Sequence, residues 1–313
     1  MRATAALDAL DALAGERGLA AMERDAPLAP LTTLRVGGPA DRLAVAASVE
    51  ELVELLRLAG EAGVEPFLLG KGSDIVVADA GIRGLVIRVR ADAVDVEPPL
   101  VRAEAGASMT GLAKRCARDG LAGFDWGISI PGSFGGAVWA NAGAHDGQMA
   151  DVVREVEVYD PREGSRRTIP AGEIGFAYRD SRFKHSPEVV LAGTMELREG
   201  DADQIGALVA EHQARRSATQ PLADQNAGSV FRNPPGDHAG RLVEAAGLKG
   251  HRIGTAQVST MHANFIVTDR GAARAADVRA LGDHVRATVL GRFGVELAYE
   301  IEFVGDWSEA VSA

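Results

Sequence analysis

The sequence predicts an α+β fold that is rich in α/β alternation and divided into more than one compact unit. Its 313 residues exceed what one small hydrophobic core organises, and they suit two or three cores. Hydrophobic residues make up 46% of the chain and charged residues 25%, which is the balance of a folded soluble protein. Helical and strand-like patterns alternate along the chain, beginning with a β-α-β unit near residues 42–70.

The first part of the chain predicts a helix and then this β-α-β unit. Residues 1–30 have the pattern of a short amphipathic helix followed by a proline-containing lead-in. The stretch RLAVAA (42–47) is strand-like, and a helix follows it because Ser48 and Glu51 have the spacing of a capping box. The next strand is VEPFLLG (64–70), which ends in glycine.

The remaining elements continue the alternation. Up to residue 217 we expect strands at 84–89, 101–107, 153–161 and 188–198, and helices at 109–120 and 200–217. A polar, proline-containing stretch at 217–226 has the composition of a connector. Beyond it we expect helices at 239–247 and 274–292, strands around 256–267 and a final strand.

Composition argues against several classes of function. The chain has 33 basic and 44 acidic residues, a net charge of -11, so a general nucleic-acid surface is not expected. Charged residues interrupt the apolar N-terminal stretch, and no run suits a membrane span, so we expect a cytoplasmic protein without membrane insertion. The single cysteine, Cys116, suits a buried apolar position, and the histidines lack the spacing of metal ligands, so no metal is expected.

Two glycine-rich stretches could approach an anionic or flat ligand closely. LLGKGSDIVVAD places Gly70 and Gly72 between two apolar strands, and it does not match a dinucleotide motif that opens a helix. The second stretch, GISIPGSFGGAVWANAGA, combines several glycines with small residues. Together they indicate a phosphate-rich cofactor held without a helix dipole, although ordinary surface loops would have the same composition.

Seven separated motifs carry a resemblance to a known family. They are GKGSD, IPGSFGGAVWANAGA, FAYRDSRFK, NAGSVFRNP, AGLKG, VSTMHANFIV and GVELAYEIEFVG, in this order. With them the chain resembles the UDP-N-acetylenolpyruvoylglucosamine reductases, also called UDP-N-acetylmuramate dehydrogenases, from about residue 31 to residue 305. Only 48 positions separate Ser181 from Ser229, which resembles the subgroup that lacks an additional tyrosine-bearing loop.

The resemblance implies a fold, a cofactor and a reaction. It implies the FAD-binding fold of the vanillyl-alcohol oxidase and p-cresol methylhydroxylase type, in two subdomains, with a C-terminal α/β substrate domain. The expected divisions are 1–30 for the N-terminal helix and lead-in, 31–100 and 101–216 for the two FAD subdomains, and 217–313 for the substrate domain. NADPH would reduce the FAD, and hydride would pass to the enolpyruvyl group of the nucleotide sugar, giving UDP-N-acetylmuramate for peptidoglycan synthesis.

The resemblance also assigns site residues. Those implied for FAD are Gly70, Lys71, Gly72, Ser73, Asp74, Pro131, Gly132, Ser133, Gly135, Gly136, Ala137, Asn141 and Gly143. Those implied for the substrate are Tyr178, Asn233, His262 and Asn264.

Three residues match the catalytic positions of the family. Arg179 suits the stabilisation of negative charge on a carboxylate, although a surface pair with Asp180 or with a neighbouring carboxylate is the alternative. Ser229 matches the proton donor to carbon, although the segment by itself has the composition of a turn. Glu300 matches the catalytic glutamate, although the alternation of VELAYEIEF puts it on what would otherwise be a solvated strand face. We therefore expect that face to border the substrate near Glu300.

The sequence departs from the family pattern at three of these motifs. Asp74 stands where asparagine is usual, His145 replaces a common aromatic residue, and Ala298 stands where glutamate is frequent. Two alternatives to the reductase remain: another flavoenzyme of the same fold, such as an oxidase of a hydroxy acid or sugar, and a catalytically silent nucleotide-sugar-binding protein. The first is expected to lack the motifs around Ser229 and Glu300, and the second to tolerate the loss of any catalytic residue.

Overall fold

The computed structural model describes residues 2–308, which form two compact units. Unit 1 is formed by Met1–Arg24, Arg42–Lys71 and Gly84–Arg216, and unit 2 by Asp25–Asp41, Gly72–Arg83 and Ser217–Ala313, as far as these ranges are described. The start of the last range coincides with the predicted domain boundary. Residues 25–30, which the sequence assigned to the lead-in, and residues 31–41 and 72–83, which it assigned to the first FAD subdomain, belong to unit 2.

The N-terminal elements confirm the predicted β-α-β beginning. They are α1 (Arg2–Glu16), β1 (Glu23–Pro27), η1 (Ala29–Leu31), β2 (Pro39–Ala46), α2 (Val49–Glu61), β3 (Phe67–Leu69), β4 (Ile75–Val77) and β5 (Ile82–Val89). The sheet order is β1-β2-β5-β3, with β3 parallel to β5. Helix α2 begins as predicted because the Ser48 hydroxyl accepts a hydrogen bond from the Glu51 amide at 3.1 Å. The Glu51 carboxylate reaches one residue further back, to the amide of Ala47.

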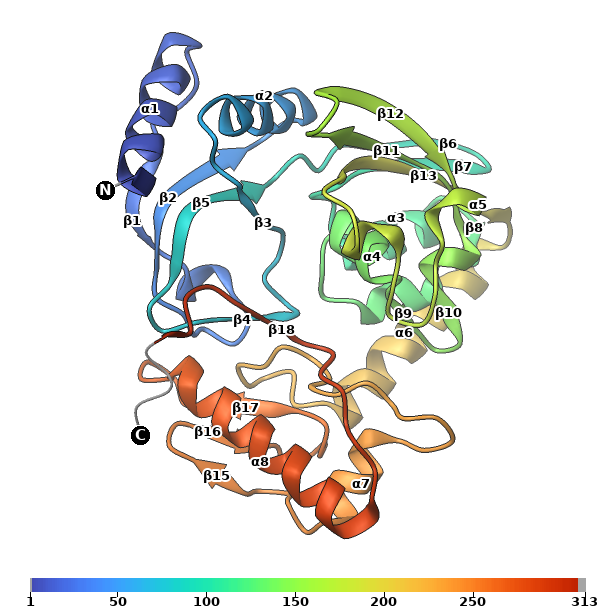
Figure 1. Ribbon diagram of the computed structural model, residues 1–313. Coiled ribbons are helices and arrows are strands. Elements are labelled where there is room, and N and C mark those ends of the chain that lie inside the picture. The colour runs from blue at the N-terminus through green and yellow to red at the C-terminus, as the bar shows by residue number, and fades with distance from the viewer. Residues whose placement is uncertain (1, 309–313) are drawn as a thin grey trace. The chain divides into compact units, whose positions relative to one another are not determined.

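Unit 1 also contains a five-stranded antiparallel sheet, which covers two helices. The sheet order is β12-β11-β13-β7-β6, and α3 and α4 lie on the same side of it (Figure 1). Phe124, Phe134 and Met109 are fully buried in the core between them. Cys116 is buried in the same core, and burial raises the pKa of its thiol to about 12, so it is an apolar packing residue as predicted.

The remaining bounds of unit 1 follow the chain in order. They are β6 (Val94–Glu97), β7 (Leu100–Glu104), α3 (Met109–Arg118), β8 (Leu121–Ala122), η2 (Asp125–Ser129), α4 (Phe134–Ala140), β9 (Gly143–Ala144), β10 (Gly147–Gln148), η3 (Met149–Asp151), β11 (Val153–Asp160), β12 (Ser165–Pro170), α5 (Ala171–Ile174), η4 (Arg182–Lys184), β13 (Val189–Glu196), β14 (Arg198–Glu199) and α6 (Ala202–Thr219). Helix α6 therefore ends inside the predicted connector.

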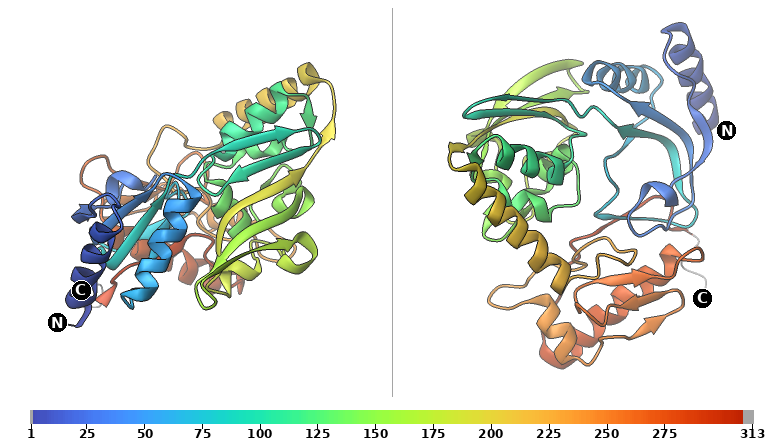
Figure 2. Two further views of the ribbon diagram at one scale, coloured as in Figure 1. Left: turned by 90° about the horizontal axis from the view of Figure 1, so that it is seen from above. Right: turned by 180° about the vertical axis from the view of Figure 1, so that it is seen from behind.

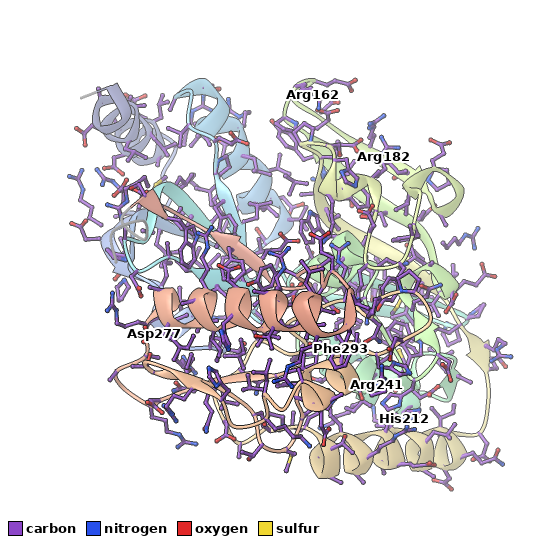
Figure 3. The ribbon with its side chains drawn as sticks, turned by 60° about the horizontal axis from the view of Figure 1, so that its bottom comes forward. Arg162, Arg182, His212, Arg241, Asp277 and Phe293 are labelled. Carbon is purple, nitrogen blue, oxygen red and sulfur yellow. The ribbon has the colours of Figure 1, made fainter. Side chains whose placement is uncertain are left out.

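Unit 2 packs one long helix against a small sheet. Its C-terminal elements are α7 (Ala239–Ala245), β15 (Arg252–Ile253), β16 (Ala256–Val258), β17 (Ile266–Thr268), α8 (Ala275–Phe293) and β18 (Glu302–Val304). The antiparallel sheet β15-β16-β17 lies against α8 (Figure 2). In the first turn of α8, Asp277 (Figure 3) accepts hydrogen bonds from the amide and hydroxyl of Thr255, which ties the helix to the sheet.

The predicted final strand is shorter than the alternation of VELAYEIEF indicated. Only Glu302–Val304 form a regular strand, β18, which pairs in parallel with β4 through Glu302 and Ile75. The apolar face was nevertheless predicted correctly, because Leu297 and Ile301 are buried in the core of unit 2. On the polar face Glu296 is 79% exposed and Glu300 is half-buried, so the two glutamates have different environments.

Candidate functional site

The first glycine stretch is a tight connection between two strands, as predicted. It follows β3 and leads directly into β4. Gly72 has a φ of +62°, and a Cβ there would lie 2.4 Å from the carbonyl oxygen of Leu31. The Gly72 carbonyl in turn accepts a hydrogen bond from the amide of Thr33 at 2.9 Å. Glycine is therefore required at this position by the backbone of unit 2 itself.

The two glycine stretches touch each other within unit 1. A Cβ added to Gly70 would lie 2.5 Å from Oγ of Ser133, so the backbone of the first stretch lies against the buried serine of the second. Residues 63 positions apart in the sequence therefore contribute to one surface. That both stretches serve the same ligand stays a prediction.

The second stretch is not an open loop, which corrects our expectation. Residues Phe134–Ala140 form helix α4, so the glycines at 135 and 136 lie inside a helix. The amides of Phe134 and Gly135 donate to the carbonyls of Ala107 and Ala105, both at 2.8 Å. Small side chains allow this close approach. In the sequence the same glycines and alanines have the composition of a loop, so a helix was not expected.

The packing of the chain explains most of these glycines but not Gly136. A Cβ at Gly135 would meet Ala105 at 2.8 Å, and one at Gly143 would meet the carbonyl oxygen of Gly147 at 2.5 Å. At the exposed Gly136 the closest atom is Oγ of Ser133 at 3.5 Å, an ordinary contact. A side chain at Gly136 would therefore fill space that the protein leaves open, which fits a flat or phosphate-rich ligand lying over α4.

Arg179 lies at the tip of a tight turn in unit 1. Ala177 and Asp180 exchange two backbone hydrogen bonds of 3.0 and 3.1 Å, and Tyr178 and Arg179 form the turn between them. Arg179 has a φ of +55°, a strained conformation for a residue with a Cβ. Its guanidinium donates to the carbonyl of Gly143 at 3.1 Å and lies over the exposed ring of Tyr178. The turn is thus joined to the second glycine stretch.

Asp180 is engaged elsewhere, contrary to the alternative in which it pairs with Arg179. Its carboxylate contacts Nε2 of His185 at 2.9 Å and accepts from the amide of Ser181. The hydrogen bond from His185 lowers the pKa of Asp180. The carboxylate that follows the arginine in sequence therefore stabilises the base of the turn.

Asn141 locks the turn that carries Arg179. It ends α4 with a φ of +44°, and its side chain is fully buried. Its Nδ2 donates to the carbonyl of Ala177 at 2.8 Å, and its Oδ1 accepts from the amide of Ala150 at 3.0 Å. The residue was predicted as an FAD contact, and the structure gives its side chain the further task of shaping the site.

Ser229 and Glu300 are carried on two paired segments of unit 2. Phe231 and Tyr299 form a β-bridge, the Glu300 amide donates to the carbonyl of Val230 at 2.8 Å, and the Arg232 amide donates to the carbonyl of Ala298 at 2.9 Å. Ser229 and Glu300 are both half-buried. Two of the three predicted catalytic residues therefore lie at one end of the same bridge.

The first glycine stretch reaches the same part of unit 2. The Glu302 amide donates to the carbonyl of Asp74 at 2.9 Å, where β18 meets β4. The backbone of Glu302, two residues after Glu300, is thus bonded to the loop that was predicted to hold FAD. Asp74, a departure from the family pattern, is held here through its backbone.

Asn264 fixes the Ser229 segment from the other side. Its Oδ1 accepts from the Phe231 amide at 3.0 Å, its Nδ2 donates to the Phe231 carbonyl at 2.8 Å, and its own carbonyl accepts from the Val230 amide at 2.8 Å. Asn264 is buried. Both groups of its amide thus hold the backbone next to Ser229, and the substrate contact expected for Asn264 stays a prediction.

Asn233 and His262 flank the bridge. Oδ1 of the exposed Asn233 accepts from the amide of Ala239 at the start of α7. Nδ1 of His262 accepts from the Asn264 amide at 3.2 Å, which requires an unprotonated Nδ1. Burial, followed by the nearby charge of Lys249, lowers the pKa of His262 in agreement with this bond.

Sequence reasoning missed an aromatic column that supports the bridge. The ring of Tyr299 stacks on Phe231 with centroids 5.2 Å apart and meets Phe303 edge-on, and its hydroxyl donates to Asp283 at 2.9 Å. Gly282 in α8 leaves room for this ring, because a Cβ there would lie 2.5 Å from the Tyr299 hydroxyl. The placement of Tyr299 and Phe303 on one face of their segment could have been predicted from the alternation. No local pattern indicates that Phe231, far away in the sequence, stacks on Tyr299.

His145, another departure from the family pattern, joins a polar cluster in unit 1. Its ring stacks on His212 of α6 (Figure 3), with centroids 3.9 Å apart. Nε2 of His145 contacts Oγ of Ser129 at 2.9 Å, and Nε2 of His212 contacts Asp125 at 3.0 Å. Burial and the neighbouring His212 lower the pKa of His145. The histidine thus occupies the aromatic position of the motif with its ring stacked on a second imidazole.

The chain matches two family descriptions. Residues 220–304 match "UDP-N-acetylenolpyruvoylglucosamine reductase, C-terminal domain", and residues 40–169 match "FAD binding domain". Together with the solved structure described next, these matches confirm the predicted fold class, a mixed helix-and-strand FAD-binding fold followed by an α/β domain. None of the helices in residues 2–308 combines the length and apolarity needed to cross a bilayer.

Individual proteins are similar over nearly the whole chain. UDP-N-acetylenolpyruvoylglucosamine reductase 2 of Symbiobacterium thermophilum is 48% identical over 286 residues, which cover 91% of this chain and 92% of that protein. The reductase of Heliobacterium modesticaldum is 46% identical over 90% of both chains. The crystal structure of the reductase from Thermus caldophilus has a TM-score of 0.78 and 35% identity, and covers 90% of this chain and 98% of that one.

Proposed function

Because this chain belongs to the UDP-N-acetylenolpyruvoylglucosamine reductase family, we propose that NADPH supplies its electrons and that Ser229 protonates its substrate. The family relationship makes it an FAD-dependent oxidoreductase that reduces UDP-N-acetylenolpyruvoylglucosamine in peptidoglycan synthesis. The observation that carries the proposal is the β-bridge that places Ser229 and Glu300 on paired segments beside Asp74. We propose a cytoplasmic location for the reaction.

The glycine stretches are proposed to hold FAD. Gly70, Ser133 and Gly136 form the surface that the cofactor would contact, because the first two touch and the third leaves open space over α4. When bound, FAD supplies the hydride that adds to the enolpyruvyl double bond. Four of the other predicted FAD residues would serve mainly through their backbones, because they are buried: Gly72, Gly135, Ala137 and Asn141.

Arg179 is proposed to bind the carboxylate of the enolpyruvyl group. Addition of hydride to the double bond moves negative charge toward this carboxylate, and a guanidinium stabilises it by paired charge-assisted hydrogen bonds. The side chain starts from a turn that Asn141 and Gly143 lock to the glycine stretch. A cation whose position is set before the charge develops does not have to reorganise during the reaction.

Ser229 and Glu300 are proposed to complete the proton transfer. A serine hydroxyl is a weak acid, so it donates only to a strongly basic partner such as the carbon of an enolate. After donation the serine oxygen must recover a proton, and Glu300 is the ionisable residue carried on the paired segment. Asn233 and His262 are proposed to contact the nucleotide sugar, and Asn264 to act through the Ser229 segment.

The two half-reactions separate these roles in rapid-mixing experiments. In Ser229→Ala we expect NADPH to reduce the flavin at a near-normal rate, while reoxidation of reduced enzyme by substrate slows by ~10² to 10³. The reason is that the hydroxyl is needed only when the substrate carbon is protonated. Flavin absorbance reports both steps.

Ser217→Ala is the matched control, because Ser217 is an exposed serine in the last turn of α6. It should change neither half-reaction. Equal slowing of both half-reactions in Ser229→Ala would contradict the role of Ser229. Failure of NADPH to reduce the wild-type flavin would contradict the choice of reductant.

A further inference from the structure

In the sequence, Arg232 lies between Ser229 and Asn233, which are both proposed to act on the substrate. Hydrogen bonds hold its backbone and that of its neighbours. Its amide donates to the carbonyl of Ala298 at 2.9 Å, and Phe231 before it is held by Asn264. Asn233 after it accepts from the first amide of α7. The origin of the Arg232 side chain is therefore fixed from three directions.

The guanidinium of Arg232 has no anionic partner within the described chain. The side chain is half-buried, its Nε is completely enclosed, and no hydrogen-bond acceptor for Nε is found among residues 2–308. The described residues also provide no carboxylate within ion-pair distance of it. An enclosed donor without an acceptor costs about 1–3 kcal/mol, and more when the group is charged.

Two other buried or half-buried arginines of the chain pair with carboxylates. Arg42 is almost fully buried and pairs with Asp8 and Asp11, and the half-buried Arg182 pairs with Glu188. Carboxylates are plentiful, since the chain has 44 acidic residues against 33 basic ones. Arg88 and Arg279 are also half-buried and have no carboxylate partner within the described chain. What distinguishes Arg232 is its enclosed Nε, the one buried side-chain nitrogen or oxygen among residues 2–308 that has no hydrogen-bond partner.

We infer that Arg232 binds an oxyanion of the nucleotide-sugar substrate, which supplies the negative charge that the chain itself does not provide. The inference rests on the proposed function of the Ser229 site. The outer edge of the planar guanidinium presents paired donors that match either a phosphate or a carboxylate. Because the charge is delocalised over the whole group, an anion at this edge also offsets the desolvation at Nε.

Two groups of the substrate could supply the oxyanion, the diphosphate and the enolpyruvyl carboxylate. UDP-N-acetylglucosamine carries only the first of these, so it distinguishes the two sources. If the diphosphate is the partner, loss of Arg232 weakens binding of both UDP-N-acetylglucosamine and the full substrate. If the carboxylate is the partner, only binding of the full substrate weakens. Either result supports the inference.

The test compares Arg232→Met with Arg241→Met in flavin-loaded enzyme. Methionine keeps an apolar stem and removes both the charge and the enclosed donor. Arg241 is an exposed arginine of α7 (Figure 3) that pairs with Asp237, and its replacement makes the same change of charge. Affinity is measured for UDP-N-acetylglucosamine by titration, and for the substrate from the concentration dependence of flavin reoxidation after chemical reduction.

We expect Arg232→Met to weaken binding of the full substrate by roughly 10- to 100-fold, and Arg241→Met by less than about twofold. A purely structural arginine would be needed for stability, so its replacement would lower the melting temperature without substrate. A ligand-binding arginine with an unsatisfied donor predicts the opposite, a melting temperature that is unchanged or higher. Arg232→Gln, with a polar side chain, repeats the affinity measurement independently.

Two results would overturn the inference: substrate affinity within about twofold of wild type in both Arg232 variants, or a melting temperature of flavin-loaded Arg232→Met that is lower than that of the wild type without substrate. A wild-type enzyme that substrate does not reoxidise would instead contradict the proposed function. Failure of the inference is therefore seen in the Arg232 variants, and failure of the proposed function in the wild-type enzyme.

Discussion

The Arg179 turn in unit 1 and the Ser229–Glu300 bridge in unit 2 are held by the same device in different settings. In each case the amide of a buried asparagine bonds the backbone close to the functional residue, Asn141 at Ala177 and Asn264 at Phe231. The first asparagine stabilises a turn in which Arg179 has a positive φ. The second stabilises an extended bridge supported by stacked aromatic rings.

The different settings predict different losses of stability when the asparagine side chain is removed. The arginine turn is short, and Ala177 is exposed, so water can replace part of what Asn141 provides. The bridge is buried at Phe231, where a lost hydrogen bond leaves an unsatisfied backbone group. We therefore expect the bridge to be the more sensitive of the two to loss of its asparagine.

The largest structural effect is expected for Asn264→Ala. The amide and carbonyl of Phe231 would both lose their partners in a buried position, which costs about 2–5 kcal/mol of unfolding free energy. Urea unfolding at a fixed FAD concentration, followed by tryptophan fluorescence, measures this cost. A loss below about 0.5 kcal/mol would remove the distinction between the two regions. We also expect slower reoxidation by substrate, because the segment that carries Ser229 is no longer held.

A smaller effect is expected for Asn141, and two substitutions separate its causes. Asn141→Gly removes the side-chain hydrogen bonds but accepts the positive φ, and we expect a cost of about 1–2 kcal/mol because Ala177 is exposed. Asn141→Ala should cost about 1 kcal/mol more, since alanine is strained in the left-handed region. The same urea titration measures both. Equal stability of the two variants would mean that backbone strain contributes nothing at this position.

The smallest effect is expected in the pH dependence of stability, where both regions contribute with the same sign. Burial lowers the pKa of His145 in unit 1 and of His262 in unit 2. Below a pH of about 6.5 the unfolded chain therefore binds more protons than the folded one, and stability falls as the pH drops through this value toward the folded pKa. His145→Phe keeps a ring against His212 and should flatten the melting-temperature curve on the acidic side.

His238→Asn is the control for this measurement, because His238 is exposed. Its curve should follow that of the wild type. A His145→Phe curve as steep as that of the wild type would show that His145 does not contribute to the acid sensitivity.

Local signals in the sequence predicted many of the elements correctly. Ser48 begins α2 because its side chain caps the first turn, and the burial of Leu297 and Ile301 follows the alternation of their segment. Such features depend on neighbours within a few residues, so they can be read without knowing the fold. The glycines at 135 and 136 were misread as loop, because their helix is stabilised by the carbonyls of Ala105 and Ala107, about 30 positions away.

The amino-acid order alone was therefore sufficient for the type and approximate place of most helices and strands, for the family, and for the residues that match its catalytic positions. Folding decided which of these residues share a backbone bridge, which asparagine side chains hold the backbone, and which arginine among residues 2–308 has an enclosed donor without an acceptor. These properties arise from contacts between segments far apart in the chain, such as residues 231, 264 and 299. Packing and hydrogen bonding between such segments leave no local periodicity from which they could be read.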